Sequence, residues 1–173
     1  GLKVHVNTAA LKPDHADEIP KLIAWAHARD MDITLIETMP LGAVDEDRTD
    51  QFLSLQAVRQ ELESFWTLND SPGRSGGPAR YVRIAETGGR LGFITPLTHN
   101  FCDTCNRLRL TADGTLRSCL FEGGEVNIRT ILREPGNSED RRGAIAHAMA
   151  ECVRLKPIVH SQHGNRQMSQ IGG

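Results

Sequence analysis

The chain has 173 residues, which is enough for one sizeable hydrophobic core, or for one core and a smaller annex. Its 20 lysines and arginines nearly balance its 22 aspartates and glutamates, which excludes the overall basic charge typical of non-specific nucleic-acid binding. No apolar run is long enough to cross a bilayer, so neither a nucleic acid nor a membrane is an expected partner.

Residues 1–68 show a βα pattern. The alternation of residues 2–7 predicts a strand, and residues 31–40, rich in β-branched and apolar side chains, predict another. A helix is expected between them, with an apolar face formed by Ile19, Leu22, Ile23 and Ala26. Strand, helix and strand at this spacing predict a βαβ unit with parallel strands. A second helix is expected after Ser54, with an apolar face formed by Leu55, Val58, Leu62 and Phe65.

Residues 69–80 are rich in proline, glycine and serine, and we interpret them as a linker between two domains. The second domain, residues 81–173, is predicted to begin with a hairpin around Thr87-Gly88-Gly89 and to continue with another around Ala112-Asp113-Gly114. Two helices, residues 126–133 and 138–154, and a polar tail complete it. The predicted architecture is therefore a βα-type half followed by a small α+β annex.

Three of the four cysteines fall within residues 102–119, a clustering that argues against the disulfide framework of a secreted protein. No charged-then-apolar leader opens the chain, so we expect a cytoplasmic protein. The chain opens with Gly1 and runs directly into a strand pattern, from which we expect the later part of a longer protein.

Cys102 and Cys105 form a C-x-x-C motif, and Cys119 lies in the returning strand of the second predicted hairpin. Because a hairpin brings its far end back beside its start, the three sulfur atoms can converge on a tetrahedral zinc ion or on an iron–sulfur cluster. The candidates for a fourth ligand are Cys152, His147, His160 and His163. If none of them binds, the metal group keeps an open position that faces a ligand.

Arg107 and Arg109 follow the C-x-x-C motif, and if this segment is a strand the two side chains would point to the same face. Two guanidinium groups aimed one way can bind a phosphate group, although a solvent-exposed strand face would show the same pattern. The pattern of these two arginines alone does not decide between a phosphate site and a solvent-exposed face.

The segment "FCDTCNRLRLTADGTLRSCLF", the upstream "IETMPLG" and the terminal "IGG" together resemble the GTP 3′,8-cyclase family, radical-SAM enzymes that begin molybdenum cofactor biosynthesis. The resemblance runs from "KVHVN" to the last residue. It implies an α/β fold, the C-terminal half of an incomplete (βα) TIM-type barrel followed by an annex that carries a [4Fe–4S] cluster.

The resemblance also implies roles for particular residues. Cys102, Cys105 and Cys119 would bind the cluster, whose fourth iron is left free for the guanine of GTP. Arg107 and Arg109 match residues that bind GTP.

Other matches and departures lie outside the cysteine segment. Met39 matches a residue that contacts S-adenosylmethionine, and Gly172 and Gly173 match a tail that reaches the active site. His5 and Thr34 stand where many members have lysine and arginine, so triphosphate binding is expected to differ here.

The family's reaction uses a second [4Fe–4S] cluster, held by C-x-x-x-C-x-x-C, to generate the 5′-deoxyadenosyl radical from S-adenosylmethionine. That radical abstracts a hydrogen from GTP, whose C3′ then attacks C8. No such spacing occurs in this chain, so we expect it to be inactive by itself. The implied partners are GTP, a second copy in a homodimer and the next enzyme of the cofactor pathway.

Two other classes of protein are alternatives to an enzyme of this family. A structural zinc module that binds a partner would need a fourth protein ligand and would be colourless. A sulfur-carrier or ubiquitin-like protein would use Gly172-Gly173 as its reactive tail, but it requires a compact β-grasp fold, which the opening βαβ pattern does not indicate.

Overall fold

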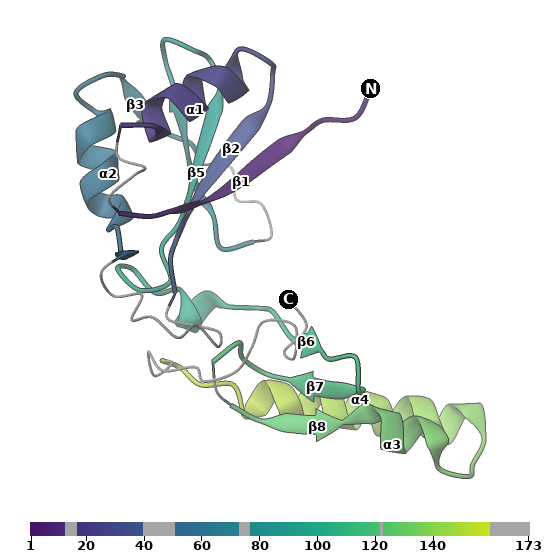
Figure 1. The fold of residues 1–173 in the computed structure, drawn as a ribbon. Helices are drawn as coiled ribbons and strands as arrows, with labels where there is room; N and C mark the ends of the chain where they lie inside the picture. The colour runs from purple at the N-terminus through teal and green to yellow at the C-terminus, as the bar shows by residue number, and fades with distance from the viewer. Residues whose placement is uncertain (13–16, 40–50, 73–76, 122, 160–173) are drawn as a thin grey trace. The chain divides into compact units, whose positions relative to one another are not determined.

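The structure is a computed structural model that describes residues 1–12, 17–39, 51–72, 77–121 and 123–159 (Figure 1). The described residues pack as two compact units. Along the chain, the first unit ends at Phe101 and the second begins at Cys102. No helix in the described ranges is both long and apolar enough to cross a membrane.

The first unit is built on a mixed five-stranded sheet in which β1, β2 and β5 are parallel and β4 runs antiparallel to both of its neighbours, β5 and β3. In sheet order the strands are β1 (His5–Ala10), β2 (Asp32–Glu37), β5 (Arg90–Ile94), β4 (Arg80–Ile84) and β3 (Leu68–Asp70). The parallel pairing of β1 with β2 confirms the predicted βαβ unit.

Helices α1 (Ile19–His27) and α2 (Leu55–Leu62) pack against β2. Pro20 lies in the first turn of α1, where its missing N–H would have had no partner in the helix. Fourteen buried apolar residues, most of them from these helices and strands, form the core. Phe65 was predicted to share the apolar face of α2, and this is wrong: the helix ends before it, and Phe65 is 58% exposed.

The predicted hairpin around Gly88 is β4–β5, and Gly88 adopts φ +69°, a value that glycine accepts readily. We expected this hairpin in a separate second domain. In the structure β5 pairs with β2, so the hairpin belongs to the first sheet. Residues 69–80, expected as a linker, lead from β3 to β4, and residues 73–76 lie outside the described residues.

The second unit contains a three-stranded antiparallel sheet and two helices (Figure 1). After the short 3-10 helix η2 (Cys102–Thr104) come β6 (Arg109–Leu110), β7 (Thr115–Arg117), β8 (Glu125–Asn127), α3 (Ile128–Arg133) and α4 (Ser138–Arg154). The predicted second hairpin and both predicted helices are confirmed. Three details were wrong, because the strands of this unit are short: Cys119 lies beyond the end of β7, Arg107 precedes β6, and residues 126–127 belong to β8 and not to α3. Asn127 and Asn137 cap the helices by accepting hydrogen bonds from backbone N–H groups.

Candidate functional site

His5 and Thr34, the two positions that depart from the family pattern, contact each other on neighbouring strands. The His5 Nε2 and Thr34 Oγ1 atoms are 2.7 Å apart and share a hydrogen bond. The Tyr81 ring stands edge-on to the imidazole, with the ring centroids 6.4 Å apart. A Cβ atom at Gly92 would lie 2.5 Å from Thr34 Oγ1, so only glycine fits there without a shift. The two departures therefore form one polar contact.

Glu37 ends β2 and is 1% exposed. Its carboxylate accepts hydrogen bonds from the backbone N–H groups of Leu55 at 3.3 Å, Leu97 at 3.1 Å and Thr98 at 3.0 Å, and from the Thr98 hydroxyl. It therefore joins the end of β2 to the start of α2 and to the 97–98 segment. Met39, the predicted S-adenosylmethionine contact, is half-buried two residues further along. Sequence analysis did not single out Glu37, although an acidic residue closing an apolar strand is the signal that could have found it.

The three clustered cysteines lie in the second unit. Cys102 begins η2, and the Cys105 N–H donates to the Cys102 carbonyl at 3.2 Å. Cys119 follows the end of β7 by two residues. Since Arg109 pairs with Arg117 across the hairpin, the chain after β7 returns toward the segment that carries Cys105. All three side chains are half-buried thiols.

Positive charges lie beside Cys105. Burial alone would raise the pKa of Cys105, but hydrogen bonds from the backbone and side chain of Arg107, and the charges of Lys156 and Arg107, hold that pKa below its ordinary value. Burial and the charge of Arg107 lower the pKa of Arg109, whereas the thiolates of Cys119 and Cys105 oppose that shift. Both cysteines therefore lie within electrostatic range of Arg109.

Lys156 contributes a contact that sequence analysis missed. Its Nζ donates hydrogen bonds to the carbonyl oxygens of Arg107 and Ser118, each at 2.6 Å. Next to Ser118, the buried Arg117 forms an ion pair with Glu125 at 3.0 Å. Within the described residues, the Ser118 hydroxyl and the Arg117 Nε atom are buried without a hydrogen-bond partner. A lone lysine after a helix gives no sequence signal for such a contact.

The donor chemistry of the three cysteines suits a thiolate-bound metal or cluster. All three thiols are partly exposed, and the cations beside Cys105 favour the deprotonated form of that thiol, which is the form that binds metal. Among the described residues, no three histidine, cysteine, aspartate or glutamate side chains are arranged to hold a metal ion. The fit of these residues to a metal group therefore rests on the chemistry of the three thiols.

The candidates for a fourth ligand have different surroundings. Cys152 is 0% exposed, its thiol donates to the carbonyls of Leu116 and Gly124, and burial raises its pKa. The sulfur of Cys152 is thus committed to the core of the second unit. His147 is exposed on α4. His160, His163 and the predicted tail residues Gly172 and Gly173 lie outside the described residues.

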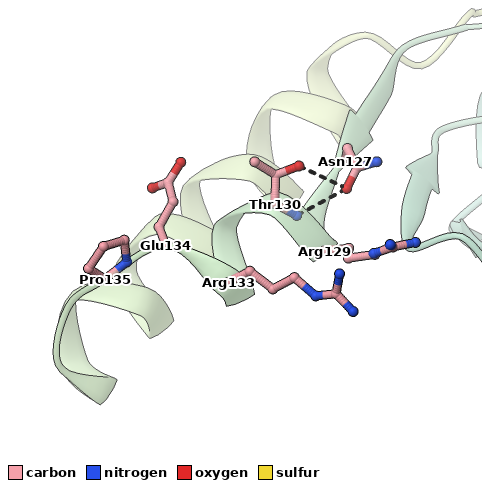
Figure 2. Close-up of a pocket in the computed structure, with 6 residues that line it drawn as sticks. All are labelled: Asn127, Arg129, Thr130, Arg133, Glu134 and Pro135. Carbon is pink, nitrogen blue, oxygen red and sulfur yellow. Dashed lines mark hydrogen bonds between the residues drawn. The ribbon is translucent and has the colours of Figure 1, made fainter.

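A pocket of about 520 Å³ lies beside α3, separate from the cysteines (Figure 2). Figure 2 shows the guanidinium groups of Arg129 and Arg133 extending in the same direction, away from Glu134. The Asn127 cap lies at one end of the pocket, where it accepts from Thr130. None of the predicted site residues lines this pocket.

The family comparison agrees with the motif. A family model described as Molybdenum Cofactor Synthesis C matches residues 31–162, a range that contains the three clustered cysteines and both arginines. The match covers more than half of the chain. The chain therefore belongs to the Molybdenum Cofactor Synthesis C family.

Individual relatives point to one enzyme. The chain is 59% identical to a GTP 3′,8-cyclase of Caulobacter vibrioides, over 90% of this chain and 42% of the relative. It is 57% identical to that of Erythrobacter litoralis, over 92% of this chain and 47% of the relative. It is 51% identical to that of Rhizobium meliloti, over 100% of this chain and 51% of the relative. The chain thus spans about half the length of the curated relatives it matches.

Proposed function

We propose that this chain is the substrate-binding part of a GTP 3′,8-cyclase of molybdenum cofactor biosynthesis. The whole enzyme would convert GTP to (8S)-3′,8-cyclo-7,8-dihydroguanosine 5′-triphosphate by radical S-adenosylmethionine chemistry. The observation that carries the proposal is the group of half-buried thiols beside Arg107, Arg109 and Lys156 in the second unit. The names of the relatives support the choice of reaction.

Cys102, Cys105 and Cys119 would hold a [4Fe–4S] cluster. Three thiolates leave one iron without a protein ligand, and when bound the cluster would supply that iron as a site for the guanine base. The role of these residues is to provide sulfur ligands, and for Cys105 the neighbouring cations favour the deprotonated form that binds metal.

Arg107 and Arg109 would bind the phosphate groups of GTP. Arg109 is half-buried, and burial strengthens a charged hydrogen bond that replaces water. His5 would contribute a weaker contact, because its Nε2 is already shared with Thr34. We place S-adenosylmethionine at Met39 and the Gly172-Gly173 tail at the active site, as the family resemblance implies.

The first unit would form the last part of an incomplete TIM-type barrel. Its parallel strands β1, β2 and β5 support this proposal, since parallel strands with crossover helices are the repeating unit of such barrels. Met39 follows the carboxyl end of β2, the end at which barrel enzymes place their active sites. We further propose a homodimer that passes its product to the next enzyme of the pathway.

GTP binding tests the substrate site. Arg107→Ala should weaken GTP binding by about 10- to 100-fold, the loss expected when one charged hydrogen-bond donor to a phosphate is removed. Isothermal titration calorimetry of the anaerobic, cluster-loaded chain measures it. The matched control is Arg133→Ala, an exposed arginine of α3, which should bind GTP like the unchanged chain. Equal affinity for the two variants would overturn the assignment of Arg107.

Measuring the iron, sulfide and zinc content of the chain distinguishes the proposed cluster protein from a structural zinc module. The chain purified without oxygen should contain about four irons with matching sulfide and be brown, as a four-iron cluster requires. One zinc ion in a colourless protein would favour the structural module instead. Because the sequence contains no C-x-x-x-C-x-x-C spacing, GTP should bind to this chain without being turned over.

A further inference from the structure

We infer that Lys156 is a positioning residue that holds together the two backbone segments carrying Cys105 and Cys119, so that their thiols can bind one metal group. The inference rests on the proposed function, since it concerns the same cysteines. Arg107 lies two residues after Cys105, and Ser118 immediately precedes Cys119. The ammonium group of Lys156 donates to both of their carbonyl oxygens at 2.6 Å.

This contact differs from the usual role of a lysine after a helix. A lysine near a helix C-terminus commonly donates to the last carbonyls of its own helix. The two acceptors of Lys156 lie 49 and 38 residues away in sequence, in two separate segments. Because both carbonyls bind the same nitrogen, they are held within about twice a hydrogen-bond length of each other. One side chain therefore sets the separation of the two cysteine-bearing segments.

The end of α4 is itself fixed, so that Lys156 has a rigid base. The Gly124 N–H donates to the Leu155 carbonyl at 3.4 Å, and the Ser118 N–H donates to the Gly124 carbonyl at 3.0 Å. A Cβ atom at Gly124 would lie 2.4 Å from the Leu155 Cβ, so the backbone approaches the helix end as closely as glycine allows. Gly124 is thus docked on Leu155, the residue preceding Lys156.

The positive charge of Lys156 would also favour binding of a metal group by the three cysteines. A metal group bound by three thiolates concentrates negative charge, and a fixed ammonium beside it offsets that charge without competing as a ligand. Arg107 and Arg109 lie nearby, but the proposed function assigns their guanidinium groups to the substrate. Lys156 instead donates to the backbone, where it can remain when GTP leaves.

Cobalt(II) binding to the metal-free chain tests this role without requiring turnover. The probe is the thiolate-to-cobalt absorption band during titration with Co²⁺ alone. Lys156→Met should weaken Co²⁺ binding by about tenfold or more, as loss of an outer-shell partner typically does. Lys156→Arg, which keeps the charge and can still donate to both carbonyls, should restore most of the affinity. The matched control Lys21→Met changes an exposed lysine of α1 and should bind Co²⁺ like the unchanged chain.

Lysine acetylation of the unchanged chain provides a test that does not depend on how the variants fold. Lys156 should react more slowly with an acetylating reagent than Lys21, because its ammonium is held by two carbonyls. Equal labelling rates, or unchanged Co²⁺ affinity in a folded Lys156→Met chain, would overturn the inference and leave the proposed function intact. An unchanged chain that binds neither cobalt nor an iron–sulfur cluster would overturn the proposed function, and the positioning role with it.

Discussion

Cys105 and Cys152 have different surroundings, which shift the pKa values of their thiols in opposite directions. Hydrogen bonds from Arg107 and the charge of Lys156 lower the pKa of Cys105 despite its partial burial, whereas burial raises the pKa of Cys152. Because the thiolate is the nucleophile, a lower pKa increases the reactive fraction at neutral pH.

We therefore expect iodoacetamide to alkylate Cys105 of the native, metal-free chain well before Cys152. Mass spectrometry of peptides taken over time measures the two rates. In denaturant the two thiols should react alike, because burial and neighbouring charges are lost. Similar rates in the native chain would contradict the described surroundings of Cys105.

Gly92 lies in β5 of the first sheet, where a larger side chain should destabilise the fold. A Cβ atom there would lie 2.5 Å from Thr34 Oγ1 and 2.8 Å from Tyr81 Cε1. Gly92→Ala should lower the free energy of unfolding by about 1–3 kcal/mol, the usual cost of an overpacked site. Urea denaturation measures the change.

Gly143→Ala is the control for this substitution. Gly143 lies within α4, and an added Cβ atom there would have no neighbouring atom within 4 Å outside its own helix backbone, so alanine should stabilise the helix by about 0.5–1 kcal/mol. Both substitutions replace glycine with alanine, but Gly92→Ala should lower the free energy of unfolding and Gly143→Ala should raise it. A neutral Gly92→Ala would mean that Thr34 and Tyr81 move aside at no cost.

At the scale of elements, Glu37 links the end of β2 by hydrogen bonds to two segments that are distant from it in sequence. Its carboxylate accepts from the first residue of α2 and from the 97–98 segment that precedes the cysteine motif. Changing a buried acceptor in this position leaves several N–H groups without partners.

Glu37→Gln should destabilise the first unit by about 1–3 kcal/mol, because the amide NH₂ would face backbone donors in place of an oxygen. Chemical denaturation followed by circular dichroism measures the loss. Glu61→Gln, on the exposed side of α2, should stay within about 0.5 kcal/mol of the unchanged chain. Equal stability of the two variants would refute the anchoring role of Glu37.

The elements themselves were predictable where their signals are local. The βαβ unit, both hairpins and the two late helices follow from apolar periodicity and from glycine at turns such as Gly88 and Gly114. Strands β3 and β8 were not predicted. Each has three residues, and strands that short are defined by pairing with a neighbour more than by their own sequence.

At the scale of the whole molecule, the two units differ in how much apolar surface they bury. The first has a core of fourteen buried apolar residues. In the described part of the second, the buried apolar residues are Leu116, Ala148 and Cys152. We therefore expect the stability of the second unit to depend more on the proposed metal group than that of the first.

Hydrogen exchange should reveal this dependence. Loading the iron–sulfur cluster should slow amide exchange in β7, β8 and α4 while leaving β2 and β5 unchanged. Cys119→Ala should remove the cluster and this added protection, with the first unit exchanging as before. Full iron content in Cys119→Ala would contradict its assignment as a ligand, and equal protection of both units without metal would contradict the weaker second core.

The sequence by itself determined the family motif, the parallel βαβ unit and the candidate residues around Cys102, Cys105 and Cys119, because spacing and periodicity are local properties of the chain. Only the tertiary structure decided that the β4–β5 hairpin joins the first sheet, that His5 meets Thr34, and that Lys156 bridges two cysteine-bearing segments. Those contacts join residues far apart in sequence. They depend on strand register and on the docking of helix ends, which no local pattern encodes.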